Sequence, residues 1–273
     1  MAQLALCKLG PADHAGLARF LDRDPVSAAY LRSELRLNPS APSWWGVADS
    51  ARELRAALLG GPLVVPWIPD PADAPALAQA LPQQGLPRML VGPAESVRAL
   101  SAAMSPWRRP VERRDPQPLL VLDRGAATAS GERAPLRRAG RGDLEALTVA
   151  AAAMHREEMG VDPLQIDSVA WRSRMVALVD RGWSFLWAHS GEVIFKAELS
   201  AWTPEVVQVQ GVWTNPQHRR GGVAFAGMAA LCTQLFRDVP VCSLYVNNYN
   251  DVALRLYRRL GFRQAGEFAT YTY

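Results

Sequence analysis

Cysteine, lysine and long apolar runs are scarce in this sequence. The three cysteines, Cys7, Cys232 and Cys242, form no CxxC pair, and their odd number argues against a disulfide framework or a zinc cluster. We predict that each is a small buried apolar residue and that the protein holds no metal. No run of about 18 uninterrupted apolar residues is present. The start has no basic segment followed by an apolar one, so no signal peptide is predicted. We therefore expect a cytoplasmic protein without a membrane partner.

Positive charge is abundant but dispersed. The chain has 30 basic and 26 acidic residues, a net charge of +4 and a pI near 9.2. Only Lys8 and Lys196 are lysines, and the arginines form only short clusters. A nucleic-acid-binding domain concentrates basic charge on one face, so a nucleic-acid partner is not expected. A homodimer is left open.

The chain is long enough for one large domain or two ordinary ones, because it has 273 residues and 49% hydrophobic content. A small, polar segment from Gly125 to Arg133 interrupts it. We predict an N-terminal domain over 1–124, a linker over 125–133 and a C-terminal domain over 134–273.

The two halves begin alike. Residues 7–17 and 137–147 share a basic residue, a glycine, an aspartate and a leucine at identical offsets, each at a predicted strand-to-helix junction. This predicts an internal duplication, with a chance match as the alternative.

Apolar periodicity predicts alternating strands and helices in both halves. In the first half we expect strands at 4–8, 44–47, 54–59, 63–65, 89–91 and 119–122, and helices at 13–21, 26–37, 76–81 and 95–104. Residues 52–59 fit a helix equally well. In the second half we expect helices from 143 to 160 and from a cap at Asp167 or Ser168 to Gly182, a hairpin over 183–201, and a central strand at 206–214. A helix at 225–236, a strand at 244–246 and a helix from Asn250 complete it.

Two glycines follow the central strand at the start of a predicted helix. At such a junction, unpaired backbone N–H groups and the helix dipole point at one spot, and glycine lets an anion approach closely. Gly221 and Gly222 therefore predict a phosphate cradle, to which Arg219 and Arg220 add positive charge. An ordinary turn with two glycines is the alternative.

A second helical face carries polar and small residues. Asn250 can cap a helix, and Ala253 and Tyr257 follow one and two turns later on the same face. Small Ala253 leaves room for a ligand chain, to which Tyr257 presents a phenol. A packed aromatic with a satisfied hydroxyl is the alternative for Tyr257.

Together these segments resemble the GNAT superfamily of acyl-CoA-dependent N-acetyltransferases. Arg219-x-x-Gly222-x-Ala224 is similar to the pyrophosphate signature of that family, Arg/Gln-x-x-Gly-x-Gly/Ala. Val246-x-x-x-Asn250-x-x-Ala253-x-x-x-Tyr257-x-x-x-Gly261-Phe262 is similar to its other motif. The resemblance implies an α/β (α+β) fold of tandem GNAT-like domains. Each would have a mixed, mostly antiparallel sheet flanked by helices, with splayed central strands in the C-terminal domain.

The resemblance also implies a mechanism: direct transfer of acetyl from acetyl-CoA to a primary amine of a small molecule or peptide. Tyr257 would protonate the leaving thiolate, and rate would come mainly from alignment and from N–H groups that polarise the carbonyl. The implied carrier-binding residues are Val212, Trp213 and Thr214 for the pantetheine arm, Arg219, Arg220, Gly221, Gly222, Val223 and Ala224 for the pyrophosphate, and Asn250, Ala253 and Tyr257.

This sequence departs from better-defined members of the family in its candidates for the general base. The central strand offers Gln208 and Gln210, which cannot accept a proton. Glu198 on the preceding strand, with Lys196 on the same face, is the first candidate, ahead of Glu158 and His218. A solvated Glu198 and a water relay are the alternatives.

The N-terminal half resembles a degenerate GNAT-like module. It lacks an Arg-x-x-Gly-x-Gly between Leu63 and Ala76, so we predict that it binds no acyl-CoA and instead shapes the acceptor cleft. Two other functions are left open. One is a non-catalytic acyl-CoA-binding sensor or interaction protein, and the other is a tRNA-dependent aminoacyltransferase.

Overall fold

The computed structural model describes residues 4–38, 43–127 and 134–273, and the chain divides into two compact units. The N-terminal unit comprises Met1–Val121, Tyr245–Leu254 and Gln264–Tyr273, and the C-terminal unit comprises Leu122–Leu244 and Arg255–Arg263. Residues 128–133 of the predicted linker lie outside the described residues. The division at that linker stays a prediction.

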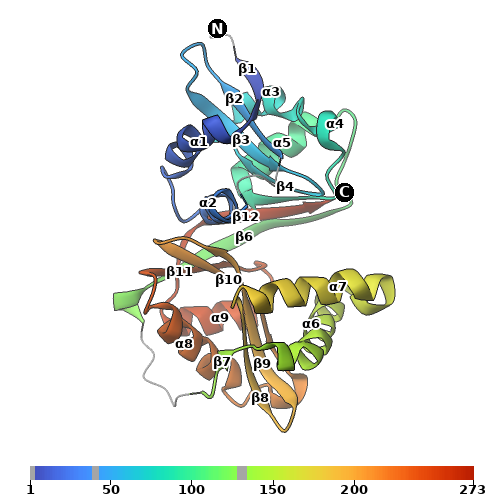
Figure 1. The fold of residues 1–273 in the computed structure, drawn as a ribbon, viewed down its shortest axis with the longest axis vertical. Helices are drawn as coiled ribbons and strands as arrows, with labels where there is room; N and C mark the ends of the chain where they lie inside the picture. Colours follow the sequence, from blue (N-terminus) through green and yellow to red (C-terminus); the bar gives the residue numbers. More distant parts are fainter. Residues whose placement is uncertain (1–3, 39–42, 128–133) are drawn as a thin grey trace. The chain divides into compact units, whose positions relative to one another are not determined.

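The N-terminal unit is a mixed sheet with helices on both faces (Figure 1). Its strands follow the order β1-β2-β3-β4-β5-β12-β6, in which β4 and β5 are parallel. Residues 54–60 form a strand, so the helical alternative for 52–59 is wrong. The elements are β1 (Ala5–Leu9), α1 (His14–Leu21), α2 (Ala29–Leu37), β2 (Ser43–Ala48), β3 (Leu54–Gly60), β4 (Leu63–Trp67), α3 (Ala74–Ala78), α4 (Leu81–Gln84), β5 (Met89–Pro93), α5 (Ala94–Met104), β6 (Glu112–Asp123) and β12 (Arg263–Thr272).

Strand periodicity divides the core of this unit between the two sheet faces. Successive side chains of a strand point to opposite faces, and the adjacent residues Trp44 and Trp45 of β2 follow this rule. Trp44 packs with α1 and α2, whereas Trp45 packs with α3 and α5. Each apolar face is therefore covered by its own pair of helices.

The strands of the C-terminal unit follow the order β11-β10-β9-β8-β7, with β10 and β11 parallel. Leu147 and Ala150 of α6 and Val179 of α7 pack on one face of it, against Leu186 and Val193. The elements are β7 (Arg137–Arg138), α6 (Leu144–Met159), α7 (Pro163–Asp180), β8 (Ser184–His189), β9 (Glu192–Trp202), β10 (Val206–Thr214), α8 (Val223–Leu235), β11 (Val241–Tyr245) and α9 (Asp251–Leu260), whose first residues fall in the N-terminal unit.

Helix α7 begins earlier than the sequence predicts. Asp162 accepts a hydrogen bond from Leu164 N at 3.0 Å and starts a first helical turn. Asp167 then interrupts the helix with φ −154° and ψ 85°, and its Oδ1 accepts from Ala170 N at 2.9 Å. The predicted cap at Asp167 is present, but inside a kinked helix, because the earlier cap adds a turn before it.

The two matched sequence segments have the same local structure. Asp13 and Asp143 each end a short 3-10 turn and accept a hydrogen bond from Gly10 N and Gly140 N, both at 2.8 Å. A helix follows each turn, and the order of the later elements also recurs in the two halves.

The cysteines differ in burial. Cys232 and Cys242 are buried free thiols, as predicted, but Cys7 is half-buried and its Sγ lies 3.4 Å from the Gly46 carbonyl oxygen. Cys7 lies on β1, the edge strand of the sheet, which leaves it partly uncovered. The prediction of full burial is wrong for this residue.

Candidate functional site

Strands β10 and β11 separate part of the way along the sheet. They pair in parallel only where Val206–Gln208 face Val241–Ser243, and β10 continues to Thr214 paired with β9 alone. The C-terminal unit therefore has the splayed central strands that the resemblance implied (Figure 1). A separated strand edge leaves backbone groups available to an extended ligand, which can bind as an added strand.

A β-bulge lies within the separated part of β10. Gln210 faces Glu198 and Trp213 faces Lys196, so Gly211 and Val212 together face a single residue of β9. Gly211 has φ +59°, a conformation that glycine adopts without strain. Val212, Trp213 and Thr214, the predicted contacts of the pantetheine arm, thus lie at and beyond the bulge.

The start of α8 has no side chain at its cap. Gly222 is the N-cap, with φ +79°, and no atom lies within 4 Å of the position that a Cβ would take. The first N–H groups of a helix have no intrahelical partner and lie at the positive end of its dipole. Val223 and Ala224 supply such groups here. The start of α8 therefore leaves these N–H groups without a side-chain cap, and anion binding there stays a prediction.

Arg220 contributes strain as well as charge to this turn. Its φ is +64°, which costs a residue with a Cβ about 1–2 kcal/mol. Such strain concentrates at ligand-binding sites, where the surrounding structure holds it in place. Together, Arg220 and Gly222 turn the backbone at the start of α8.

Arg219 is held by a residue that sequence reasoning missed. Its NH2 donates to Glu157 Oε2 at 2.6 Å, and its Nε donates to the Thr214 carbonyl at 3.0 Å. Glu157 Oε1 also accepts from Trp213 Nε1 at 3.2 Å. Glu157 thus joins the end of α6 to the cradle turn. No spacing in the sequence links positions 62 residues apart, so no signal could have found this contact.

Helix α9 has the cap that the sequence predicts. Asn250 Oδ1 accepts from Ala253 N at 3.1 Å, and Leu254 N donates to the Asn250 carbonyl at 3.0 Å. Ala253 and Tyr257 follow on the same helical face, as their spacing requires. The shared face is therefore present.

Tyr257 is buried, at 6% exposure, with its ring 5.6 Å from that of Phe262. The ring is therefore packed, and the role of its hydroxyl stays a prediction. Burial, and then the nearby Cys232 and Glu158, raise the pKa of this phenol well above its ordinary value. The hydroxyl keeps its proton at neutral pH.

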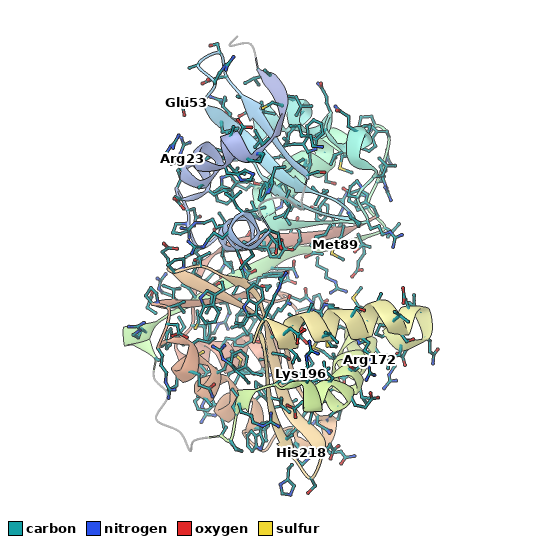
Figure 2. The ribbon with its side chains drawn as sticks, in the orientation of Figure 1. Arg23, Glu53, Met89, Arg172, Lys196 and His218 are labelled. Carbon is teal, nitrogen blue, oxygen red and sulfur yellow. The ribbon has the colours of Figure 1, made fainter. Side chains whose placement is uncertain are left out.

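Glu198 lies in a buried ion cluster with Lys196 and Arg174. Lys196 Nζ donates to Glu198 Oε1 at 2.8 Å, and Arg174 NH2 donates to Oε2 at 3.0 Å. Both β9 side chains have 0% exposure, so the alternative of a solvated Glu198 is wrong. Burial alone would raise the pKa of this carboxyl, but the two cations together hold it below its ordinary value. Figure 2 shows Lys196 on β9.

The other candidate bases lie elsewhere in the C-terminal unit. His218 is half-buried at the end of a 3-10 turn, Pro216–His218, that follows β10 (Figure 2). Gln208 Oε1 lies 3.0 Å from Ser200 Oγ.

Among the described residues, no group of three or more His, Cys, Asp or Glu side chains could hold a metal ion. Within those same ranges, no helix has the length and apolar character needed to span a bilayer.

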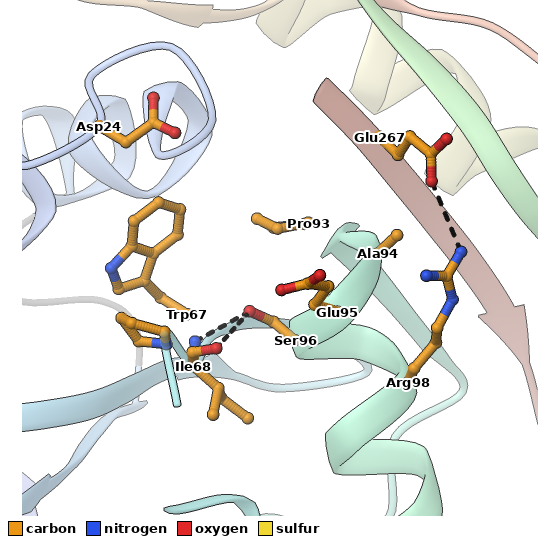
Figure 3. Close-up of a pocket in the computed structure, with 10 residues that line it drawn as sticks. Asp24, Trp67, Ile68, Pro93, Ala94, Glu95, Ser96, Arg98 and Glu267 are labelled. Carbon is orange, nitrogen blue, oxygen red and sulfur yellow. Dashed lines mark hydrogen bonds and ion pairs between the residues drawn. The ribbon is translucent and has the colours of Figure 1, made fainter. Parts of the chain in front are cut away.

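The corresponding strands of the N-terminal unit, β4 and β5, pair only at Leu63–Val64 and Met89–Leu90. A cavity of about 420 Å³ lies where they separate, next to the start of α5 (Figure 3). Its single guanidinium, Arg98, is bound by Asp115 and lies 3.7 Å from Glu267. The charged residues that line it are Asp24, Glu95, Arg98 and Glu267. Three carboxylates and one guanidinium make this cavity acidic.

Comparisons with known proteins agree with this geometry. Residues 151–262 match the acetyltransferase (GNAT) family, and residues 42–147 match a domain of unknown function, DUF4081. No curated protein matches the chain.

Similar solved structures span almost the whole chain. A GNAT-family acetyltransferase from Colwellia psychrerythraea has a TM-score of 0.64 and 13% identity over 98% of this chain and 99% of that one. A GCN5-related N-acetyltransferase from Sphaerobacter thermophilus has a TM-score of 0.65 and 18% identity over 98% and 94%. A tandem GNAT protein from the clavulanic acid biosynthesis pathway has a TM-score of 0.60 and 15% identity over 99% and 98%.

At these identities the solved structures establish the fold, whereas the family match identifies the C-terminal residues. The match covers the splayed strand β10, the cradle turn and α9. Residues 151–262 are thus similar to the GNAT acetyltransferase family by this match.

Proposed function

We propose that the protein transfers an acetyl group from acetyl-CoA directly to a primary amine of a small molecule or peptide. The observation that carries this proposal is the open start of α8, where Gly222 leaves the first N–H groups free of any side chain. That opening follows a strand whose edge is no longer paired with β11. An extended arm with a pyrophosphate at one end fits this pair of features.

In this proposal each part of the carrier has its own residues. The backbone of Val212, Trp213 and Thr214 pairs with the pantetheine arm, and Asn250 and Ala253 orient and accommodate it. When the carrier binds, Arg219 releases Glu157 and binds the pyrophosphate, since a guanidinium binds phosphate as well as carboxylate. The pyrophosphate-binding set is Arg219, Arg220, Gly221, Gly222, Val223 and Ala224.

The chemistry needs no acyl-enzyme. The amine nitrogen forms a bond to the thioester carbon, and the carbonyl electron pair moves onto oxygen. When that oxyanion collapses, the carbon–sulfur bond breaks and the electron pair leaves on sulfur. Tyr257 gives its proton to this thiolate; burial keeps the phenol protonated at neutral pH, but the raised pKa also makes it a weaker acid.

Two proposals remain for the group that takes the proton from the amine. One is Glu198, whose two cationic partners hold its pKa low and oppose proton acceptance. The other is a water relay. The pH profile of Glu198→Gln separates them, because loss of the base removes the acidic limb of the profile, whereas a water relay leaves that limb in place.

A non-catalytic acyl-CoA-binding sensor is the second candidate function. The observation that favours it is the occupied carboxylate of Glu198, combined with glutamines at positions 208 and 210 of β10.

Two measurements on the full chain test these functions. We expect calorimetry to show one acetyl-CoA bound per chain, and we expect thioester consumption with a mixture of amines, peptides and amine-bearing antibiotics. Absence of acetyl-CoA binding contradicts both functions. Binding without thioester consumption supports the sensor and contradicts the transferase.

A further inference from the structure

The buried ion cluster of Lys196, Glu198 and Arg174 contacts the backbone of the bulge as well as its own members. Lys196 Nζ donates to the Gly211 carbonyl at 3.0 Å, in addition to its bond with Glu198. Gly211 is the bulged residue with φ +59°. A buried charge therefore lies directly against a peptide of the bulge.

Space as well as conformation requires glycine at this position. A Cβ on Gly211 would lie 3.0 Å from Glu198 Cδ and 3.3 Å from Lys196 Nζ. The cluster and the bulge thus fit closely, and the ammonium is held on one side of the Gly211–Val212 peptide.

The contact fixes the direction of the N–H group in that peptide. In a planar trans peptide the oxygen and the N–H point in opposite directions. Since the Gly211 oxygen points at Lys196 Nζ, the Val212 N–H points away from the cluster. A bulge residue is left out of the regular pairing, and both Gly211 and Val212 are only half-buried. The contact therefore places the Val212 N–H on the side of the peptide opposite Lys196.

The charges of the cluster strengthen this donor. Two cations and one carboxylate give the cluster a net positive charge. The Lys196 side chain, which carries the ammonium, has 0% exposure. A buried ammonium on the carbonyl oxygen draws electron density from the peptide, and chains of hydrogen bonds polarise one another. Preorganised donors of this kind stabilise the oxyanion of acyl transfer.

We propose that Lys196, held by Glu198 and Arg174, is a positioning residue that orients and polarises the Gly211–Val212 peptide so that the Val212 N–H donates to the thioester carbonyl oxygen. This inference rests on the proposed function. It gives the cluster a task on the acyl group, separate from proton transfer and from binding of the carrier pyrophosphate.

The test compares wild type with a double variant, Lys196→Met together with Glu198→Gln. The double variant removes both fully buried charges, because loss of one partner alone leaves an uncompensated buried charge. The measurement is the infrared carbonyl stretch of acetyl-CoA labelled with carbon-13 at the thioester carbonyl. We expect the stretch to shift to lower frequency on binding to wild type and to lose most of that shift in the double variant.

Turnover and affinity give a second readout. We expect kcat to fall about tenfold or more in the double variant, since loss of a whole oxyanion donor costs about 100- to 1000-fold. The affinity for CoA itself, which has no thioester carbonyl, should stay within about twofold. Ser200→Ala is the matched control, because Ser200 lies on the same strand and bonds Gln208 rather than Gly211.

The outcomes separate this inference from the proposed function. Absence of acetyl-CoA binding by wild type overturns both. Binding with an unshifted carbonyl stretch in wild type overturns the inference alone, and this result needs no variant to fold. A double variant with a fall in kcat and the wild-type carbonyl stretch also overturns it, because Glu198 would then act in proton transfer.

Discussion

The helix that follows β4 and the helix that follows β10 begin at corresponding places in the two halves, but with opposite chemistry. Before α3, Asp70 caps the turn by accepting from Ala72 N at 3.0 Å, and buried Asp73 binds Arg55 Nε at 3.1 Å. Before α8, Gly222 leaves the helix start empty beside two arginines. The same order of elements therefore has a paired carboxylate at the helix start in one half and an uncapped glycine in the other.

The second helix of each half continues this contrast. Helix α5 begins after Pro93, which provides no side-chain cap, and seven residues later has buried Leu100. Helix α9 begins after Asn250, which does cap it, and seven residues later has Tyr257. The N-terminal half therefore lacks both the open cradle and the candidate acid.

The largest expected effect comes from placing a carboxylate in the open cradle. In Gly222→Glu the new side chain would occupy the N–H groups of α8 and repel the pyrophosphate, and such like-charge contacts cost several kcal/mol. We expect acetyl-CoA affinity to fall at least about 100-fold in calorimetry. The variant would make the start of α8 resemble that of α3.

Gly85→Glu is the matched control for this change. Gly85 lies in the N-terminal unit, has φ +89° and has no atom within 4 Å of a Cβ position, so the added charge is the same. Its ψ of 150° gives glutamate more backbone strain than the ψ of 0° at Gly222, which makes it a stringent control for strain. It should bind acetyl-CoA as wild type does. Wild-type affinity in Gly222→Glu would contradict the cradle.

The next effect concerns the candidate acid. Tyr257→Phe removes only the hydroxyl, so we expect kcat to fall about 100-fold, in the range typical of general acid–base catalysis, with CoA affinity unchanged. Because burial raises the pKa of Tyr257, wild-type activity should not decline through ionisation of this phenol at neutral pH.

Tyr249→Phe is the control for the acid, since Tyr249 is 70% exposed. Steady-state kinetics with a thioester and an accepted amine give both values. Unchanged turnover in Tyr257→Phe would remove the acid role and leave the residue as a packed aromatic.

A smaller effect is expected for the acidic helix start of the N-terminal half. Asp73 is buried and paired with Arg55, so Asp73→Asn should lower the free energy of unfolding by about 1–3 kcal/mol. Asp70→Asn should cost less than about 1 kcal/mol, because this side chain is 53% exposed. Urea unfolding measures both.

The number of acetyl-CoA molecules bound per chain tests whether the N-terminal half also binds the carrier. Each of these variants should still bind one acetyl-CoA per chain with wild-type affinity, because their carboxylates belong to the half without a cradle. A change in the number of carriers bound would show that the N-terminal half also takes the carrier, contrary to the comparison.

Local features of the site could be predicted from the sequence, because they depend on residues close along the chain. Gly222 at a helix start and Asn250 as a cap are set by backbone conformation within a few residues. The Glu157–Arg219 contact joins positions 62 residues apart and depends on how α6 packs. Periodicity could not predict it.

Two other findings also needed the three-dimensional structure. The sequence placed Lys196 and Glu198 on one strand face, but burial of this pair depends on Arg174 of α7 and on the bulge at Gly211. Likewise, β12 pairs with β5 of the N-terminal unit, although it follows the C-terminal elements in the chain. Strand pairing between distant segments leaves no local pattern.

The smallest effect is expected at the two matched strand-to-helix junctions, residues 7–17 and 137–147. Asp143 accepts from Arg137 NH1 and NH2 at 2.7 and 2.8 Å, and these bonds lower the pKa of its carboxyl. The position that corresponds to Arg137 in the first half is Cys7, whose thiol pKa is raised by burial and by Asp13. One junction thus has an ion pair that the other lacks.

This difference sets the sign of a pH effect. Because folding lowers the pKa of Asp143, its contribution is present above the ordinary carboxyl value and is lost as the pH falls through the folded one. Arg137 is 56% exposed, so solvent screening limits the contribution to less than about 1 kcal/mol. Urea unfolding of Asp143→Asn should show a loss near pH 7 that disappears once the pH falls below the lowered pKa of this carboxyl. Asp13→Asn should show a smaller loss, and an equal loss at the two junctions would contradict a stabilising role for the Arg137 pair.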